Sequence, residues 1–374
     1  KYVGVIDSPD IPLNVSRSYL QSDANVKKID GYITNKVISA LRDIFNKDRE
    51  EYIKKWECFE LFLYIGLITE ESLFNKVKDI LLLKDVHNNY FTIDEYTESI
   101  KEKQTDKDNN LVYLYTSSKD RQYTYIKQAE DLGYSVISME NQFATYLVNL
   151  FEHSLENVRV VRVDADTIDK LIDKGETAEN VLSNEDVTLL VQLFSSQLRN
   201  DFQETQMSVK IAALNENALP VMVVTNEHIR RLKEVSMQNP TMPYYAGMKF
   251  QMSVVFNSNS TVVKNILNDA KTAIGKEYDE YQKTLAECRE QINLINITNK
   301  DKKEEEIDNI EKDAKDQYNN KIMETNGKIS TLVQEYTNGQ DRIKQLLDIA
   351  YIQNGMLHGE AFDEFIKRSI KVIE

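Results

Sequence analysis

The sequence predicts a multidomain protein of mixed α/β and α+β class. Its 374 residues suggest two or three domains. Short β-branched runs alternate with helical patterns, and residues 276–338 carry a heptad pattern. We therefore expect the end of an α/β unit, a helical connector, a small αβα unit and a C-terminal α+β unit into which a long helical coiled-coil hairpin is inserted.

Residues 1–46 are predicted to complete the α/β unit. A β-like run of Tyr2, Val3, Val5 and Ile6 breaks at Ser8-Pro9, because proline cannot donate to a strand ladder. A helix should follow, since apolar residues then recur at helical spacing. These residues are Leu20, Ile29, Ile33, Val37, Leu41 and Ile44.

Residues 47–105 show helical patterns rich in aromatic residues, so we expect a helical connector. Trp56, the only tryptophan, has helical spacing with Phe59 and is expected in a core. Cys58 lies between them and is predicted to be a buried free thiol rather than a metal or redox site.

Residues 106–165 are predicted to form the small αβα unit. Two apolar runs, residues 111–116 and 133–137, are expected to be strands with a helix between them, which is a βαβ arrangement. Residues 166–185 are acidic and poor in aromatics, which favours a linker to the C-terminal unit, residues 186–374.

The C-terminal unit is expected to begin with a helix over residues 187–202. Strands at 208–213 and 221–225, a helix at 227–235 and a strand at 249–256 should follow. Residues 237–248 form a proline-broken loop that is rich in methionine and tyrosine: Met237, Met242, Tyr244, Tyr245 and Met248. Such side chains suit a surface that accepts varied apolar partners, while a loop folded back over its own sheet is the alternative.

Residues 276–338 are predicted to form an antiparallel coiled-coil arm. Its outgoing helix keeps a/d spacing through Tyr278, Tyr281, Leu285, Cys288, Ile292 and Ile295. After a polar tip near residues 298–303, the returning helix has apolar residues with one phase shift. They are Ile307, Ile310, Ala314, Tyr318, Ile322, Ile329, Leu332 and Tyr336. The arm is interpreted either as a binding arm or as a solvated spacer.

Two short amphipathic helices are expected at the C-terminal end. One apolar stripe comprises Ile343, Leu346, Leu347, Ala350 and Tyr351, and the other comprises Phe362, Phe365, Ile366 and Ile370. Two short helices cannot bury both stripes against each other. Pairing with the same helices of a second chain would bury them in a four-helix bundle, and docking onto the unit's own sheet is the alternative.

Composition excludes several classes of function. The formal net charge of −15 argues against a nucleic-acid partner. The four histidines are isolated, so no metal site is predicted, and no glycine-rich phosphate loop occurs. No long apolar run predicts a membrane span, and two cysteines suit the reducing cytoplasm. No nucleophile and base form a recognisable constellation.

Residues 7–21, Asp-Ser-Pro-Asp-Ile-Pro-Leu-Asn-Val-Ser-Arg-Ser-Tyr-Leu-Gln, place an arginine on a proline-stiffened loop that enters a helix. A guanidinium can hold two phosphate oxygens, and Gln21 lies one turn after Arg17 on the same face. The alternative is that Arg17 pairs with Asp7 or Asp10 across the loop.

This loop resembles the catalytic loop in the middle domain of heat-shock protein 90 chaperones, with all ten specified positions of Asp-Ser-x-Asp-x-Pro-Leu-Asn-x-Ser-Arg-x-x-Leu-Gln present. Residues 111–116 and 133–137 are similar to two strands of that family. Asn141-Gln142-Phe143 departs from the family's Ile-Asp-Glu-Tyr, so no role of that acidic pair is transferred. The long arm is also absent from typical members.

The resemblance implies a fragment of an ATP-dependent molecular chaperone, with the nucleotide-binding domain upstream. Arg17 would contact the terminal phosphate of ATP on that domain and Gln21 would support the same site. ATP and Mg²⁺ would belong to the parent ATPase, and this fragment would hold no cofactor and be inactive alone.

The resemblance also implies partners. Unfolded or partly folded client proteins would bind the methionine-rich loop, and the terminal helices would form a homodimer. The final residue, Glu374, without an acidic peptide tail, favours a bacterial type. The competing interpretation is a structural coiled-coil scaffold that dimerises through residues 276–338.

Overall fold

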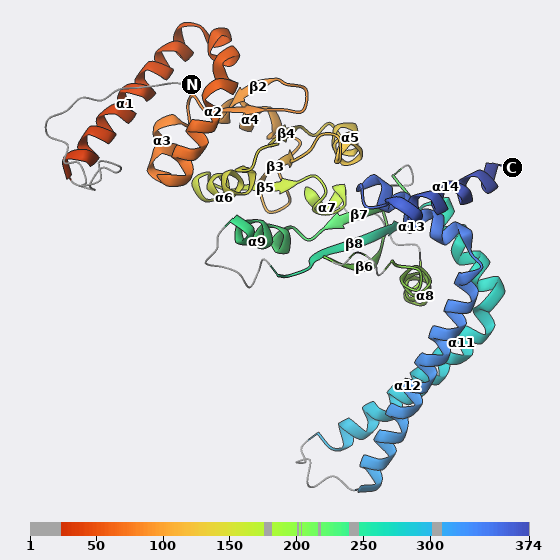
Figure 1. Ribbon diagram of the computed structural model, residues 1–374. Helices are drawn as coiled ribbons and strands as arrows, with labels where there is room; N and C mark the ends of the chain where they lie inside the picture. Colours follow the sequence, from red (N-terminus) through yellow and green to blue (C-terminus); the bar gives the residue numbers. More distant parts are fainter. Residues whose placement is uncertain are drawn as a thin grey trace, which may run out of the picture.

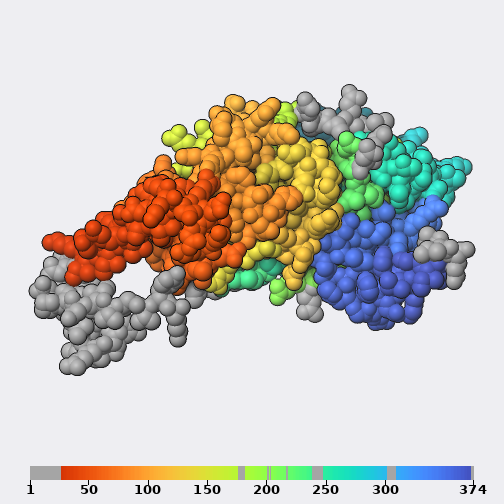
Figure 2. All heavy atoms as spheres, turned by 90° about the horizontal axis from the view of Figure 1, so that it is seen from above, coloured from red at the N-terminus to blue at the C-terminus, as the bar shows by residue number. Residues whose placement is uncertain are grey.

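The computed structural model describes residues 24–175, 182–199, 202, 204–215, 218–238, 247–300 and 309–373. Figure 1 shows an elongated body from which a two-helix arm projects. Seen from above, the N-terminal helices lie at one end of the body and the C-terminal helices lie toward the other (Figure 2).

Two helices begin the described chain, α1 (Ala24–Lys47) and α2 (Arg49–Thr69). They are separated by Asp48, whose carboxylate accepts a 2.9 Å hydrogen bond from the amide of Glu51 and so caps α2. Trp56 is buried in α2, as expected. Cys58 is exposed, so the prediction of a buried thiol was wrong. Two residues correspond to about 200° around a helix, which turns Cys58 away from the core that holds Trp56.

The expected helical connector also contains a β-hairpin. A short helix, α3 (Phe74–Val77), leads into β1 (Leu82–Lys84), which pairs antiparallel with β2 (Tyr90–Thr92) before α4 (Ile93–Ile100). Asp85 stabilises the turn by accepting 2.8 Å hydrogen bonds from the amides of His87 and Asn89. Strands of three residues are too short to give a recognisable alternation, so the sequence did not reveal them.

A three-stranded parallel sheet in the order β4-β3-β5 follows. Its strands are β3 (Leu111–Thr116), β4 (Val136–Ser138) and β5 (Val158–Arg162), and its connecting helices are α5 (Tyr123–Asp131) and α6 (Ala144–Ser154). Every residue of β3 is buried, as its continuous apolar run predicts for a central parallel strand. The predicted βαβ arrangement is confirmed.

The segment expected to be a linker contains a short helix, α7 (Ile168–Leu171), with Leu171 and Ile172 buried. A second sheet then has the order β6-β8-β7, with β6 parallel and β7 antiparallel to β8. Its elements are α8 (Asn184–Ser195), β6 (Thr205–Ala212), β7 (Val221–Thr225), α9 (Glu227–Gln238) and β8 (Phe250–Asn257). These helices and strands agree with the predicted ones to within a few residues, except for the C-terminal end of α8.

An apolar cluster joins the two sheets. Val112 and Leu114 of β3 belong to the same buried cluster as Met222 and Val224 of β7 and Val255 of β8. The hydroxyl of Tyr125 in α5 also donates to the backbone carbonyl of Val223 in β7. The small α/β unit and the C-terminal unit therefore share a hydrophobic interface.

The arm is an antiparallel hairpin of α11 (Thr261–Thr298) and α12 (Asn309–Asn338), which lie side by side in Figure 1. Its half nearest the body has a buried seam that comprises Tyr278, Leu285 and Cys288 of α11 and Thr325, Ile329 and Val333 of α12. Ile310 is 75% exposed, so its predicted place in the seam was wrong. The heptad phase breaks before Ile322, and the packed seam ends near that break.

The last two helices are α13 (Asp341–Gln353) and α14 (Gly359–Ile373). Ile343, Leu346, Leu347, Ala350 and Tyr351 of α13 are all buried within this chain, in the core that also holds residues of α8, β7 and β8. This is the alternative in which the α13 stripe docks onto its own unit. The α14 stripe differs, because Phe362, Ile366 and Ile370 remain 40 to 50% exposed.

Candidate functional site

The predicted catalytic residues and most of the predicted client-binding loop lie outside the described residues. This applies to Arg17, Gln21, Met242, Tyr244 and Tyr245. Met237 is exposed at the end of α9, and Met248 is half-buried just before β8. The two described methionines therefore lie at the C-terminal end of α9 and two residues before β8.

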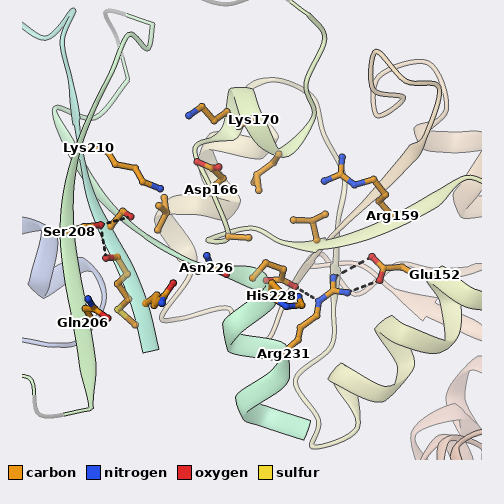
Figure 3. Close-up of a pocket in the computed structure, with 18 residues that line it drawn as sticks. Glu152, Arg159, Asp166, Lys170, Gln206, Ser208, Lys210, Asn226, His228 and Arg231 are labelled. Carbon is orange, nitrogen blue, oxygen red and sulfur yellow. Dashed lines mark hydrogen bonds and ion pairs between the residues drawn. The ribbon is translucent and has the colours of Figure 1, made fainter. Parts of the chain in front are cut away.

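A polar cleft lies where α9, β5 and α7 face the sheet of β6 and β8 (Figure 3). Its volume is about 710 Å³. Ten of its lining residues carry polar or charged side chains that Figure 3 labels: Glu152, Arg159, Asp166, Lys170, Gln206, Ser208, Lys210, Asn226, His228 and Arg231. The cleft was invisible in the sequence, because it is assembled from segments up to about a hundred residues apart.

Some of the charged side chains that line the cleft form ion pairs, and others do not. Arg231 donates 2.6 Å hydrogen bonds to Glu152 and to Glu227, and Arg159 lies 3.1 Å from a carboxylate oxygen of Asp106. Lys170 and Lys210 form no ion pair with any residue that the structure describes. Asp166 is therefore the one lining carboxylate that can offset these two lysines, and the cleft keeps a net positive wall.

Arg230, next to the cleft, is buried to 3% exposure between α9 and β3. Its guanidinium donates to Tyr115 at 2.8 Å and to Glu227 and Glu234 at 2.6 Å. Burial acts to lower the pKa of Arg230. The Tyr115 oxygen and the two carboxylates act in the opposite direction and have the larger effect, so the pKa of Arg230 is raised. Burial in turn raises the pKa of Tyr115 to about 12. This network fixes α9 on the small α/β unit.

Residues three or four apart share one face of a helix, so the sequence spacing favours ion pairs within α9. The residues with this spacing are Glu227, Arg230, Arg231 and Glu234. The spacing did not reveal the partners Tyr115 and Glu152, which are distant in sequence. Within the ranges that the structure describes, no three His, Cys, Asp or Glu side chains gather as metal ligands would.

The exposed face of α14 is a second candidate surface. Phe362, Ile366 and Ile370 lie along one side of this helix, while Phe365 packs against the core. Arg368 pairs with the buried Asp348 of α13 and thereby ties α14 to the body. Burial raises the pKa of Asp348 even though Arg368 acts in the opposite direction. The apolar stripe of α14 is thus held in place without being covered.

Comparison with known proteins relates this geometry to a family. The family model described as Hsp90 protein matches residues 1–295. The chaperone protein HtpG of Bacteroides thetaiotaomicron is 40% identical over 370 residues, which cover 99% of this chain and 54% of that protein. The chaperone protein HtpG of Porphyromonas gingivalis is 37% identical over the same shares. The match to these two proteins runs through the arm.

More distant relatives match less of the chain. The chaperone protein HtpG of Francisella tularensis is 26% identical over 295 residues, or 74% of this chain. The chain spans about half the length of the HtpG relatives from Bacteroides thetaiotaomicron and Porphyromonas gingivalis. Among the described helices, none is both long and apolar enough to cross a bilayer.

Proposed function

This chain belongs to the Hsp90 protein family, and from that premise we propose that its parent protein is an ATP-dependent molecular chaperone of the bacterial cytoplasm. The observation that carries the proposal is the 40% identity to a chaperone protein over 99% of the chain. The resemblance of residues 7–21 to the family's catalytic loop, seen in the sequence, agrees with it.

The proposed contribution of this chain to ATP hydrolysis is one arginine and one glutamine. Arg17 would meet the terminal phosphate of ATP, bound with Mg²⁺ on a domain of the parent that this chain does not include. A guanidinium stabilises the charge that develops on a transferring phosphoryl group. Gln21 would hydrogen-bond at the same site. Without that domain the chain should hydrolyse no ATP.

Client binding is proposed for the segment that leads into β8. Met237, Met242, Tyr244, Tyr245 and Met248 supply flexible or amphipathic side chains, which adapt to apolar segments of different shape. The exposure of Met237 supports this proposal.

A homodimer is proposed through the terminal helices, chiefly through α14. Its stripe of Phe362, Ile366 and Ile370 is exposed, whereas the stripe of α13 is buried in its own unit. A fixed helix with an uncovered apolar side is suited to self-complementary pairing about a two-fold axis. The dimer would hold two ATP-binding domains near each other.

The scaffold alternative places the dimer contact in the arm. In the structure, the buried seam of α11 is filled by α12 of the same chain. The heptad pattern that motivated a scaffold is therefore accounted for, in the half nearest the body, by pairing within one molecule.

The test of the proposed function is Arg17→Ala in the parent protein. The matched control is Arg121→Ala, an exposed arginine about a hundred residues later in the sequence. We expect ATP turnover to fall at least a hundredfold, since a positioned arginine acts mainly in the transition state. Nucleotide affinity, measured by calorimetry, should change less than threefold. Unchanged turnover would remove Arg17 from the mechanism, and absence of any client refolding by the wild type would refute the chaperone proposal.

A further inference from the structure

Strand β6 forms one edge of its sheet, because the order is β6-β8-β7. It is eight residues long, contains neither proline nor glycine, and has Lys210 as its only charged residue. Natural proteins usually shorten, bend, cover or charge such an edge to prevent pairing with other chains. A long edge strand with one charge is an available template for a further strand.

The ladder register shows which backbone groups of β6 are directed outward. Glu204 and Ala212 accept hydrogen bonds from β8, so alternate residues between them also bond to β8. The amides and carbonyls of Met207, Val209 and Ile211 consequently point away from the sheet. No described residue bonds to these groups, so three donors and three acceptors are available along about 14 Å of strand.

The two faces of β6 differ in chemistry. Gln206, Ser208 and Lys210 are exposed and line the polar cleft (Figure 3). Met207, Val209 and Ile211 are half-buried on the other face, against the C-terminal core. Directly opposed residues of neighbouring strands lie on the same face of a sheet. A strand added at this edge would therefore place alternate side chains against the core and in the cleft.

The charge of the cleft determines which residues an added strand can place in it. Lys210 lies on β6 itself, and Lys170 of α7 faces the cleft from the opposite wall (Figure 3). Neither lysine pairs with a carboxylate in the described part of the chain. An added strand with acidic residues on this side would meet both cations, whereas lysines there would be repelled.

We propose that the outer edge of β6 binds an extended polypeptide segment as an additional strand, with apolar residues against the core alternating with acidic residues in the cleft. Backbone hydrogen bonds supply affinity in this mode of recognition, and alternate side chains supply selectivity. The inference rests on the chaperone function proposed above and specifies one kind of client segment. Because β6 and β8 begin side by side, the site adjoins the start of β8, which Met248 precedes by two residues.

The test measures binding of labelled nine-residue peptides to the 374-residue chain by fluorescence anisotropy. One peptide alternates valine with aspartate, a second alternates valine with lysine, and a third is the aspartate peptide with every backbone amide N-methylated. We expect the methylated peptide to bind at least tenfold more weakly, because it keeps its side chains but cannot donate to a strand. Methylated and unmodified peptides that bind within twofold of each other would overturn the proposal.

Two variants test the site on the protein. Val209→Pro removes an outward amide but no bond to β8, and should weaken the aspartate peptide about tenfold. We expect the wild-type chain to bind the aspartate peptide more tightly than the lysine peptide. Lys210→Glu should reverse this preference. Lys283→Glu on the arm is the charge-matched control and should leave both affinities unchanged. A preference that Lys210→Glu does not alter would overturn the assignment of the cleft side.

Two further readouts separate this proposal from others. Prevention of aggregation of a heat-unfolded protein is measured on the same samples, so failure of the peptide tests with intact prevention refutes only the β6 site. Failure of both refutes the proposed function as well. If a rise in mass with concentration is abolished by Val209→Pro while peptides do not bind, the occupant of the edge is a second copy of β6, and the proposal is wrong.

Discussion

Arg230 shows how one side chain can hold two units together. It is almost fully buried, and it reaches from α9 to Tyr115 of β3 while two carboxylates of its own helix neutralise it. Removing one member of a buried ionic group leaves the others without a partner in a poorly solvated site. The cost of its loss should therefore exceed the cost of losing an exposed pair.

We expect Arg230→Met to lower the free energy of unfolding by about 3 kcal/mol in urea denaturation. The control is Arg342→Ala, which removes the exposed pair with Asp269 and should cost less than about 1 kcal/mol. Equal losses for the two variants would show that the buried network contributes no more than a surface pair.

Glu95 predicts a pH-dependent contribution to stability. Its hydrogen bond with Arg49, assisted by the amide of Thr92, lowers the pKa of Glu95 from 4.5 to about 2. A lowered folded-state pKa stabilises the protein above the unfolded-state value, and this contribution disappears as the pH falls from about 4.5 to 2. Because 42% of the side chain is exposed, the effect at pH 7 should be below about 1 kcal/mol.

We therefore expect Glu95→Gln to destabilise the chain slightly at pH 7 and to lose most of this effect by pH 2.5, when the midpoints of thermal unfolding are compared. Glu98→Gln, in the same helix and more exposed, should show no such trend. A difference between Glu95→Gln and wild type that stays constant from pH 7 to 2.5 would contradict the assignment.

At this scale, the sequence predicts the chemistry of a side chain better than its surroundings. Trp56 was correctly expected in a core, because a large aromatic residue loses much by exposure. Cys58 was expected to be buried but is exposed. A small thiol has only a weak preference for burial, so its position around α2 decides its exposure. The residues of the cleft were missed because their proximity depends on how two units pack.

At the scale of elements, length and pattern decided what was predictable. β3 and β7 are continuous apolar runs, and both were expected near their observed bounds, as was β8. The heptads predicted the outgoing helix of the arm from residue 276, whereas α11 begins at Thr261. β1 and β2 are too short to show a period. The apolar stripe of α13 predicted that one face of the helix is buried. It did not identify the surface that covers this face, because an amphipathic helix docks equally well on its own sheet or on another chain.

The exposed stripe of α14 gives the prediction at this scale. Phe362→Ser with Ile366→Ser should convert a dimer to a monomer in light scattering over a concentration series, because a self-complementary contact loses its apolar centre on both chains. Asp363→Ala with Lys367→Ala removes an exposed ion pair from the same helix and should leave the mass unchanged. A dimer that survives the first change would exclude α14 as the contact.

At the scale of the whole molecule, the distal half of the arm is separable from the body by its packing. The seam nearest the body is different, because Tyr278 and Ile329 belong to the same buried cluster as Leu189 of α8. The other two apolar clusters in the described part of the chain contain no residue of the arm. We expect a chain in which residues 276–338 are replaced by a short loop to keep its dimer mass and its far-ultraviolet circular dichroism per helical residue. A version that ends at Gly339 should lose the dimer. Loss of the dimer on removing only the arm would instead support the scaffold.

The position of the arm also governs the order in which the chain can be completed during its synthesis. One hydrophobic core contains Phe256 of β8 and Ile266 at the start of α11, together with Leu347 and Tyr351 of α13. At about 5 to 20 residues per second, a ribosome needs roughly 4 to 16 seconds to make the 80 or so residues between Ile266 and Leu347. During that interval the apolar surface that α13 will cover is exposed to solvent. The nascent chain is therefore itself prone to aggregation until α13 has been synthesised.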